Sequence, residues 1–176
     1  MSGQRAASGT REDGGQPAAS RTPPAQLRFI AFRVGAETFL VDIMAVRQIL
    51  MYSGSTRVPT APSFVEGVIV VRDEAIPVID VHARLYPQRT GPVDQPLVLL
   101  THTGAGMIGL KVDEVPTLVM LSSDALLPAP AMVHGIRGEF LVGIAQHGDE
   151  IFLVLDVETL LTTDEQRQLT NPTPNV

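Results

Sequence analysis

The chain of 176 residues contains no cysteine and no tryptophan. The absence of cysteine excludes disulfides, thiolate zinc sites and a cysteine nucleophile. Aromatic residues make up only 5% of the chain, so it offers few stacking platforms for nucleic-acid bases or sugars. Lysine is almost absent as well, because Lys111 is the single lysine among 13 basic residues.

Long apolar runs are also missing. The sequence has no stretch of about 18 apolar residues that would cross a bilayer. Its start, residues 1–5, lacks the apolar segment of a signal peptide. We therefore expect a cytoplasmic protein without direct membrane insertion. The formal net charge of −6 argues against nucleic acid as a partner, since binding of phosphates needs clustered positive charge.

The apolar residues that the chain does contain are unevenly distributed. They make up 44% of the sequence, but Met1 is the only large apolar residue before Leu27. A segment of that composition cannot offset its ordering entropy by burial, so we expect residues 1–26 to form a disordered arm. The folded domain is then expected to cover residues 27–169, followed by a loose tail at 170–176.

From Leu27 onward, apolar residues alternate with period two in short segments separated by glycine, proline and polar turns. This pattern is typical of β-strands joined by hairpins. The predicted strands are at residues 27–34, 38–41, 48–52, 68–71, 75–79, 97–102, 107–112, 117–121, 140–145 and 151–155. About ten short strands with little helix predict an all-β fold made of small antiparallel barrels.

Three local features refine this prediction. Pro77 cannot donate a hydrogen bond to a neighbouring strand, so its strand is expected to be an edge strand or to contain a bulge. Asp42 is expected to cap a short helical turn. Val157, Leu160 and Leu161 stand at helical spacing and predict a closing helix over residues 156–169.

No catalytic, metal-binding or cofactor-binding residue is predicted. The four histidines do not pair at metal-ligand spacing, and no carboxylate cluster does so. The serines lack the G-x-S-x-G motif of a nucleophile elbow. The segment Gly104-Ala105-Gly106 lacks the lysine and the helix of a phosphate-binding loop, and a hairpin turn explains its glycines.

Arg72 is the most informative polar residue, because it lies at the tip of an apolar hairpin beside Asp73. Two interpretations are equally supported. Arg72 is either a solvated turn residue or an anchor in a protein interface, where its planar donors and apolar stem are useful. Val46, Gln48 and Leu50 are expected on one face of a nearby strand, and core packing explains at least half of them.

Several short motifs stand in a fixed order along the chain. The first are Phe29-x-x-Phe32-x-x-Gly35, Phe39-x-Val41-Asp42-Ile43, Val46-x-x-Ile49, Thr56-Arg57-Val58-Pro59, Pro62-x-Phe64-Val65-x-Gly67-Val68, Val70-Val71-Arg72-Asp73 and Ile76-Pro77-Val78-Ile79-Asp80. The later ones are Gly109-x-x-Val112-Asp113-x-Val115, Leu141-x-Gly143 and Leu153-x-Leu155-x-Val157-Glu158-x-Leu160-Leu161. This ordered set resembles the CheW family of chemotaxis coupling proteins over residues 27–163.

The resemblance implies two SH3-like five-stranded β-barrels with short helices and a closing C-terminal helix. It also implies a non-enzymatic adaptor in bacterial chemosensory signalling, without a cofactor and recruited from the cytoplasm to receptor arrays at the membrane. Its partners would be the regulatory domain of a CheA-type histidine kinase and the cytoplasmic tip of a chemoreceptor. The receptor helix would lie in a groove between the barrels.

By positional match, the resemblance places six residues at or near the partner contacts. They are Val46, Gln48, Arg72, Val98, Leu99 and Leu100. Two positions depart from the family pattern, which usually has glycine in place of Asp73 and often glutamate in place of Gln48. Aspartate accepts a left-handed backbone better than most residues, so the turn is expected to survive, but its carboxylate offers Arg72 a local ion-pair partner.

Two further functions remain open at this point. One is an adaptor of the same kind in a twitching-motility or other non-flagellar chemosensory pathway. The other belongs to a different class, a small β-barrel enzyme or ligand-binding domain with a pocket between the barrels. Such a pocket needs convergent polar groups, and the sequence shows no cluster of them.

Overall fold

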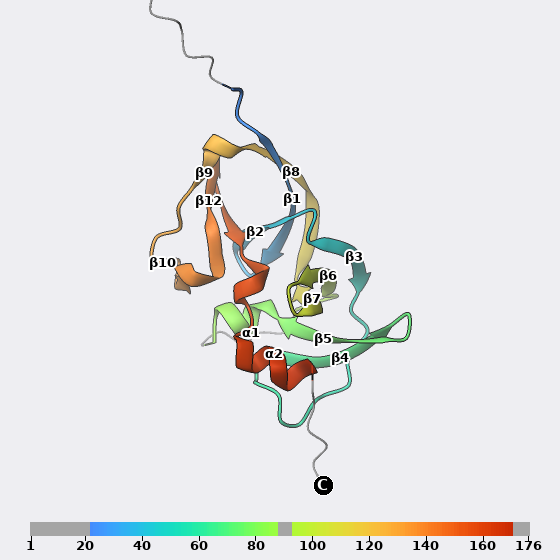
Figure 1. Cartoon of the computed structure of the whole chain (residues 1–176). Helices are drawn as coiled ribbons and strands as arrows, with labels where there is room; N and C mark the ends of the chain where they lie inside the picture. The colour runs from blue at the N-terminus through green and yellow to red at the C-terminus, as the bar shows by residue number, and fades with distance from the viewer. Residues whose placement is uncertain (1–21, 88–92, 171–176) are drawn as a thin grey trace, which may run out of the picture.

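The fold consists of two β-sheets, which Figure 1 shows one above the other in the computed structural model. The structure describes residues 22–87 and 93–170. The expected arm and tail therefore lie mostly outside the described residues, at 1–21 and 171–176. Gln26 is already the first residue of a strand and lies opposite Ser122.

The upper sheet, the first barrel, has the strand order β8-β1-β2-β13-β12-β9. Its strands are β1 (Gln26–Val34), β2 (Glu37–Asp42), β8 (Glu114–Ser122), β9 (Leu126–Leu127), β12 (Leu141–His147) and β13 (Glu150–Leu155). The short hairpin β10 (Met132–Val133) and β11 (Ile136–Arg137) precedes β12. The barrel is one strand larger than expected, because the two residues of β9 pair with β12.

The lower sheet, the second barrel, has the order β3-β6-β7-β5-β4. Its strands are β3 (Val46–Met51), β4 (Val65–Val71), β5 (Glu74–Asp80), β6 (Leu97–Thr103) and β7 (Gly106–Val112). Helix α1 (Val81–Leu85) follows β5, and helix α2 (Thr163–Thr170) ends the described chain. Short 3-10 turns lie at Ser123–Ala125, Gly138–Phe140 and Val157–Thr159. The all-β prediction with two small barrels is confirmed, but the barrels are not wholly antiparallel, because β2 pairs with β13 and β5 pairs with β7 in parallel.

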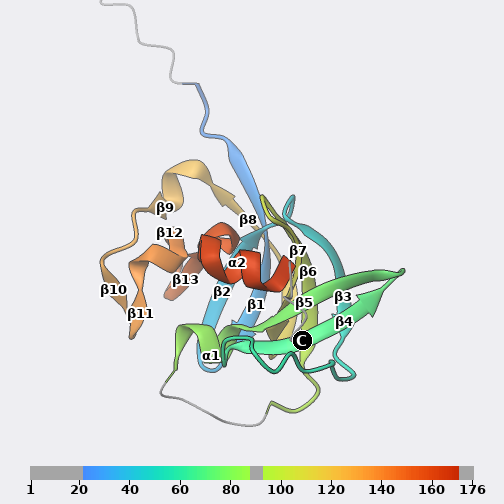
Figure 2. The ribbon, with the colours of Figure 1, turned by 60° about the horizontal axis from the view of Figure 1, so that its bottom comes forward.

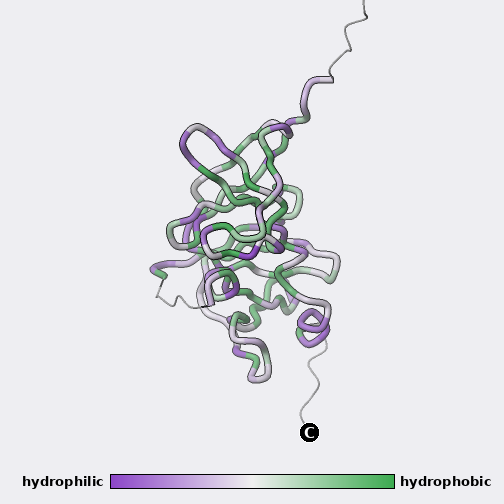
Figure 3. The backbone as a smooth tube through the Cα atoms, turned by 90° about the vertical axis from the view of Figure 1, so that its left-hand side faces the viewer, coloured by the Kyte–Doolittle hydropathy of each residue, from purple (hydrophilic) through white to green (hydrophobic). Residues whose placement is uncertain are grey.

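Three apolar clusters hold these sheets together. One fills the first barrel and includes Phe29 and Phe152, and a second fills the other barrel and includes Ile76 and Val98. The third, the shared core, joins strands of both sheets around Phe32. Figure 3 shows the hydrophobic segments gathered inside, whereas most of α2 is hydrophilic. The seam between the barrels is therefore packed with side chains, which fixes the two sheets to each other.

Strand β6 explains how one strand serves two clusters. Val98 and Leu100 belong to the core of the second barrel, and Leu99 belongs to the shared core. Successive side chains of a strand point to opposite faces, so a strand between two cores must be apolar at every position. This is why the run Leu97–Leu100 does not alternate with polar residues.

The closing helix begins later than predicted and is divided in two. The Asp156 carboxylate accepts the Glu158 backbone N–H at 3.0 Å and starts a 3-10 turn. Thr162 then starts α2, because its hydroxyl accepts the Glu165 N–H and the Glu165 carboxylate accepts the Thr162 N–H. This reciprocal capping box marks a second helix start that spacing alone did not reveal.

Two other local predictions are modified by the sheet. Asp42 does cap a turn, since its carboxylate accepts the Met44 N–H at 2.8 Å, but β3 follows directly without a helix. Pro77 does not lie on an edge strand, because β5 runs between β7 and β4, and the bulge in the β4–β5 pair lies in β4, between Val65 and Gly67. The β5–β7 register begins at Val78, so Pro77 is never required to donate to β7.

Candidate functional site

A bulge in β3 separates two of the predicted contact residues. Val46 lies opposite Thr101 and Gln48 lies opposite Leu100, with a register shift between them. As a result Val46 packs against the shared core, whereas Leu50 packs into the second barrel. The prediction that Val46, Gln48 and Leu50 share one face is wrong for Val46, because the extra residue of the bulge moves the following side chains to the other face. Gln48 and Leu50 do share a face, since they lie opposite Leu100 and Val98 of the second barrel.

The structure brings β6 directly beside β3 but places its predicted contact residues beneath the surface. Val98, Leu99 and Leu100 are exposed by 1%, 0% and 2%. Leu100 lies opposite Gln48, which is half-buried. In this arrangement the three β6 side chains support β3 from within the cores. Their role at an interface stays a prediction.

Five of the ten exposed large apolar side chains in the described residues lie instead on β3, on β8 and in the turn before β3. We call this surface the seam margin. Its apolar members are Met44, Ile49, Met51, Leu118 and Met120, all of them exposed. Ile49 lies opposite Leu99 of the shared core, and Leu118 lies opposite Ile30, which packs against that core. Residues directly opposite each other point to the same face of a sheet, so both margins continue the shared core toward solvent.

The turn between β2 and β3 joins the two margins. Its Ile43 N–H donates to the Arg28 carbonyl of β1 at 3.1 Å, and its Ala45 carbonyl accepts the His102 N–H at 2.8 Å. The same turn is therefore hydrogen-bonded to β1 of the first barrel and to β6 of the second barrel. Sequence reasoning missed the seam margin, although Leu118 and Met120 alternate with the more buried Val119 and Leu121 and so make β8 apolar on both faces.

A second surface surrounds a hollow of about 530 Å³ between β3 and β4, which we call the hairpin hollow. Leu50, Tyr52, Val71 and Val98 are among its lining residues, and Val70 at its rim is 73% exposed. The isolated bridge between Thr56 and Val68 closes one end. Strands β3 and β4 are the two edges of the second sheet, so the hollow is the opening of an incompletely closed barrel.

Arg72 lies at the tip of the β4–β5 hairpin, directly after the residues that line this hollow. Val71 pairs with Glu74, and both intervening residues have positive φ, 49° at Arg72 and 64° at Asp73. This is the backbone of a tight two-residue hairpin turn, which usually contains glycine or asparagine. The expected survival of the turn with Asp73 is confirmed. Among the described residues Arg72 forms no ion pair, so its guanidinium is available to a partner.

One ionic network stabilises the wall of the second barrel. The Lys111 ammonium contacts the carboxylates of Glu66 at 3.0 Å and Asp80 at 3.1 Å. Partial burial alone lowers the pKa of Lys111, but the two hydrogen-bonded carboxylates outweigh it and raise the pKa. The Tyr52 hydroxyl donates to Glu66 at 3.1 Å, and burial raises the pKa of this hydroxyl. The network ties the end of β3 to β4, β5 and β7, which is a structural role.

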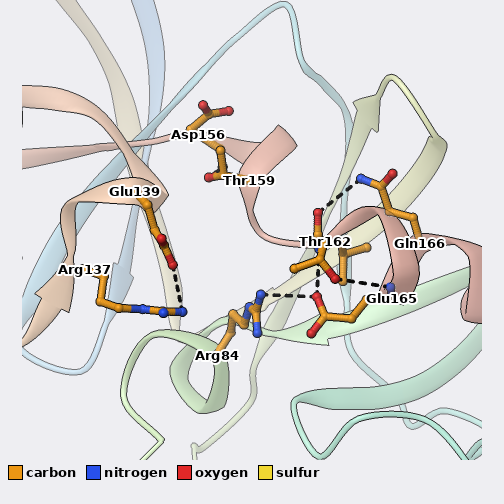
Figure 4. A network of polar contacts seen from close by, with 9 residues as sticks. Arg84, Arg137, Glu139, Asp156, Thr159, Thr162, Glu165 and Gln166 are labelled. Carbon is orange, nitrogen blue, oxygen red and sulfur yellow. Dashed lines mark hydrogen bonds and ion pairs between the residues drawn. The ribbon is translucent and has the colours of Figure 1, made fainter.

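A second network ties α2 to both barrels (Figure 4). The Arg84 guanidinium of α1 lies 4.2 Å from the ring centre of Phe64 and 5.1 Å from that of Phe140. It also donates to the Glu165 carboxylate of α2 at 3.3 Å. Burial lowers the pKa of Arg84, and the negative charge of Glu165 opposes that effect. In Figure 2, α2 lies in front of the junction between the sheets.

The described residues hold neither a metal-binding cluster nor a membrane-spanning helix. Within residues 22–87 and 93–170, no group of three histidine, aspartate or glutamate side chains lies close enough to hold a metal ion. No helix in the same ranges is long and apolar enough to cross a membrane. What the surface does offer is apolar area with few charges, which suits the binding of other polypeptides.

Comparison with known proteins agrees with this interpretation. A family model described as "CheW-like domain" matches residues 28–165. The chemotaxis protein CheW of Klebsiella aerogenes is 28% identical over 143 residues, which cover 81% of this chain and 86% of that protein. Protein FrzA of Myxococcus xanthus is 31% identical over 153 residues, which cover 85% of this chain and 93% of that protein.

The fold has a counterpart among solved structures. The crystal structure of the scaffolding protein TtCheW from Thermoanaerobacter tengcongensis superposes with a TM-score of 0.72, covering 89% of this chain and 96% of that one, at 23% sequence identity. This likeness concerns the fold, and the family model covers both barrels and the start of α2. The chain therefore belongs to the CheW family and is an adaptor of the chemotaxis scaffold type.

Proposed function

We propose that this protein is a non-enzymatic adaptor that couples the cytoplasmic tip of a chemoreceptor to the regulatory domain of a CheA-type histidine kinase. The observation that carries the proposal is the pair of apolar surfaces, which share only strand β3, on a chain of the CheW family. A coupling protein must hold two partners at once, so it needs two surfaces that do not overlap completely. The protein would work in the cytoplasm, recruited to receptor arrays by the receptor tips.

We assign the seam margin to the receptor. A receptor tip presents helices, and an amphipathic helix binds by laying its apolar stripe against an apolar surface formed by separate elements. The seam margin offers Ile49 and Met51 from one sheet and Leu118 and Met120 from the other. These side chains supply the apolar contact, and the turn at 42–45 supports the junction between them.

We assign the hairpin hollow to the kinase. Its surface combines the exposed Val70, the apolar lining of the open barrel and the unpaired Arg72 at the tip. Arginine is among the residues enriched at energetically important interface positions, which cluster in well-packed pockets. In this proposal Arg72 remains a contact residue, as predicted from the sequence, and Val70 is a new one.

Binding of the two partners to matched variants tests the proposal. Leu118→Asp is expected to weaken binding of a receptor-tip fragment at least tenfold, on the order of the loss of one buried apolar side chain, and to leave kinase binding unchanged. Val70→Asp is expected to do the reverse. Met132→Asp, at an exposed apolar position of β10, is the control and should affect neither. Folded wild-type protein that binds neither partner would overturn the proposal.

A variant of the same function fits the same two surfaces. In that variant the adaptor serves a non-flagellar chemosensory pathway and carries the same two surfaces. Binding assays against the receptors and kinases of each pathway in one organism would distinguish the two, since only the cognate set should bind. An enzyme or ligand-binding function would instead appear as a metabolite that raises the melting temperature.

A further inference from the structure

Two arginines border the apolar residues of the seam margin. Arg28 of β1 is exposed and lies opposite Met120, so both side chains point to the same face of the sheet. Arg47 is exposed at the bulge of β3, next to Val46 of the shared core. The two cations belong to different sheets, and the turn at 42–45 connects their strands. Each of the two sheets thus contributes one exposed arginine on or next to a strand of the seam margin.

Neither arginine is neutralised within the described part of the chain. Three other exposed arginines have acidic partners close by: Arg33 with Glu114, Arg137 with Glu139, and Arg167 with Asp164. No ion pair or side-chain hydrogen bond of Arg28 or Arg47 is present in residues 22–87 and 93–170. Asp42 is near in register, opposite Phe29, but its carboxylate accepts the Met44 N–H.

The contrast with the rest of the molecule is informative. The chain carries a formal net charge of −6, so acidic side chains outnumber basic ones. Arg57 and Arg72 are also exposed and without an ion pair in the described residues, so Arg28 and Arg47 are distinguished by their place on the strands that carry the seam margin. An arginine offers a planar set of donors that matches a carboxylate, and its stem adds apolar contact.

We infer that the seam margin selects an amphipathic helix whose apolar stripe is flanked by carboxylates on both sides. This inference rests on the proposed function and specifies the partner chemistry at the same site. The strand β3 has six residues, which at about 3.3 Å each give about 20 Å. A helix rising 1.5 Å per residue covers that length in about three and a half turns. The apolar stripe then meets the methionine, leucine and isoleucine side chains, while acidic residues on either side reach Arg28 and Arg47.

The expected energetic effect is moderate and sensitive to salt. Exposed ion pairs are weak individually, so two of them should favour an acidic helix over a neutral one by about three- to tenfold. The preference should decline as salt is raised from 0.05 M to 1 M, because the screening length falls to about 3 Å. The apolar contact should persist in high salt.

Three helical peptides of about 14 residues with one apolar stripe test this. They carry glutamate, glutamine or lysine at the flanking positions and are stapled to equalise helicity. The full chain should bind the glutamate peptide most tightly. The Arg28→Glu/Arg47→Glu variant should reverse the order and prefer the lysine peptide. Arg57→Glu is the matched control, since Arg57 is exposed and without an ion pair in the described residues but lies in the segment before β4.

Equal binding of the three peptides would overturn the inference, whether or not a receptor fragment binds. Loss of glutamate-peptide binding in the Arg57→Glu control would overturn it too, because a general charge effect would then suffice. Binding of no peptide together with dimer formation, abolished by Met51→Asp, would show that a second copy covers the face. Peptide binding that appears only after removal of residues 1–21 would identify that segment as the occupant instead. Failure of the coupling function is measured separately, as loss of receptor and kinase binding by the wild type.

Discussion

Replacing Arg84 by methionine tests whether a charge inside the molecule holds three parts of the fold together. The guanidinium contacts the Phe64 and Phe140 rings and donates to Glu165, so it joins α1, the first barrel and α2. Figure 4 shows the contact between Arg84 and Glu165. The side chain is only 13% exposed. Methionine keeps most of the apolar stem and removes the charge together with all donors. The variant therefore isolates the ionic and cation–π part of the contact.

The magnitude follows from the partners. Each ring contact contributes about 0.5–1 kcal/mol at a partly buried site. The ion pair with the partly exposed Glu165 adds about 0.5 kcal/mol after screening by solvent. Removal of the buried Arg84 Nε–H, which has no partner, returns about 0.5 kcal/mol. The net expected loss of unfolding free energy is about 1–2 kcal/mol for Arg84→Met, and about 3 kcal/mol for Arg84→Ala, which also loses the packed stem.

Urea unfolding followed by circular dichroism measures these values. Arg167→Met, on the exposed side of α2, is the control and should change the unfolding free energy by less than about 0.5 kcal/mol. A double-mutant cycle of Arg84→Met with Glu165→Gln separates the ion pair from the capping role of Glu165. Unchanged stability in Arg84→Met would refute the reasoning, since it would mean that the charge contributes nothing beyond what a neutral stem provides.

Three other predictions follow from the second barrel. Lys111 and Tyr52 have pKa values raised above the ordinary 10.5 and 10.0, so the folded state holds protons that the unfolded state releases at high pH. Their contribution to the unfolding free energy is complete below a pH of about 10 and falls as the pH rises further. Lys111→Met should reduce this fall, measured by urea unfolding at pH 9 to 11. A Cβ at Gly67 would lie 2.5 Å from the Thr56 carbonyl oxygen, so Gly67→Ala should cost more than about 2 kcal/mol by the same assay, whereas Gly104→Ala should be nearly neutral. Arg72→Ala should change stability by less than about 1 kcal/mol and weaken kinase binding measured by calorimetry; a large loss of stability would make Arg72 a structural residue.

The strands were predictable because their signal is local. Period-two alternation and the turn at Gly35 mark β1 and β2, and two short apolar runs around Arg72-Asp73 mark the β4–β5 hairpin; the structure confirms these elements. The bulge in β3 was not predictable, because one inserted residue leaves the hydrophobic pattern of so short a strand almost unchanged. The division of the closing helix depends on two side-chain caps, at Asp156 and Thr162, that compete with a continuous helix.

The candidate site was less predictable than the fold because exposure is decided by distant parts of the chain. An apolar strand such as β8 looks buried on both faces, and only the assembled sheets show that Leu118 and Met120 lie beyond the shared core. The burial of Arg84 is a second example, in which a charged residue is less exposed than its sequence suggests. It is charged and close to a helix end, yet it is largely buried because Phe64 and Phe140 come together around it. Neither arrangement leaves a local signal in the sequence.

Strand β3 is the element that belongs to both candidate surfaces. Ile49 contributes to the seam margin and Leu50 lines the hairpin hollow, while Met51 belongs to both. Because β3 is an edge strand paired only with β6, its position depends on one row of hydrogen bonds and on the packing of Val46 and Leu50. Protein interiors are close-packed, so a partner that shifts β3 at one surface must also move the side chains at the other. A receptor bound at the seam margin and a kinase bound at the hairpin hollow would therefore contact opposite faces of the same strand.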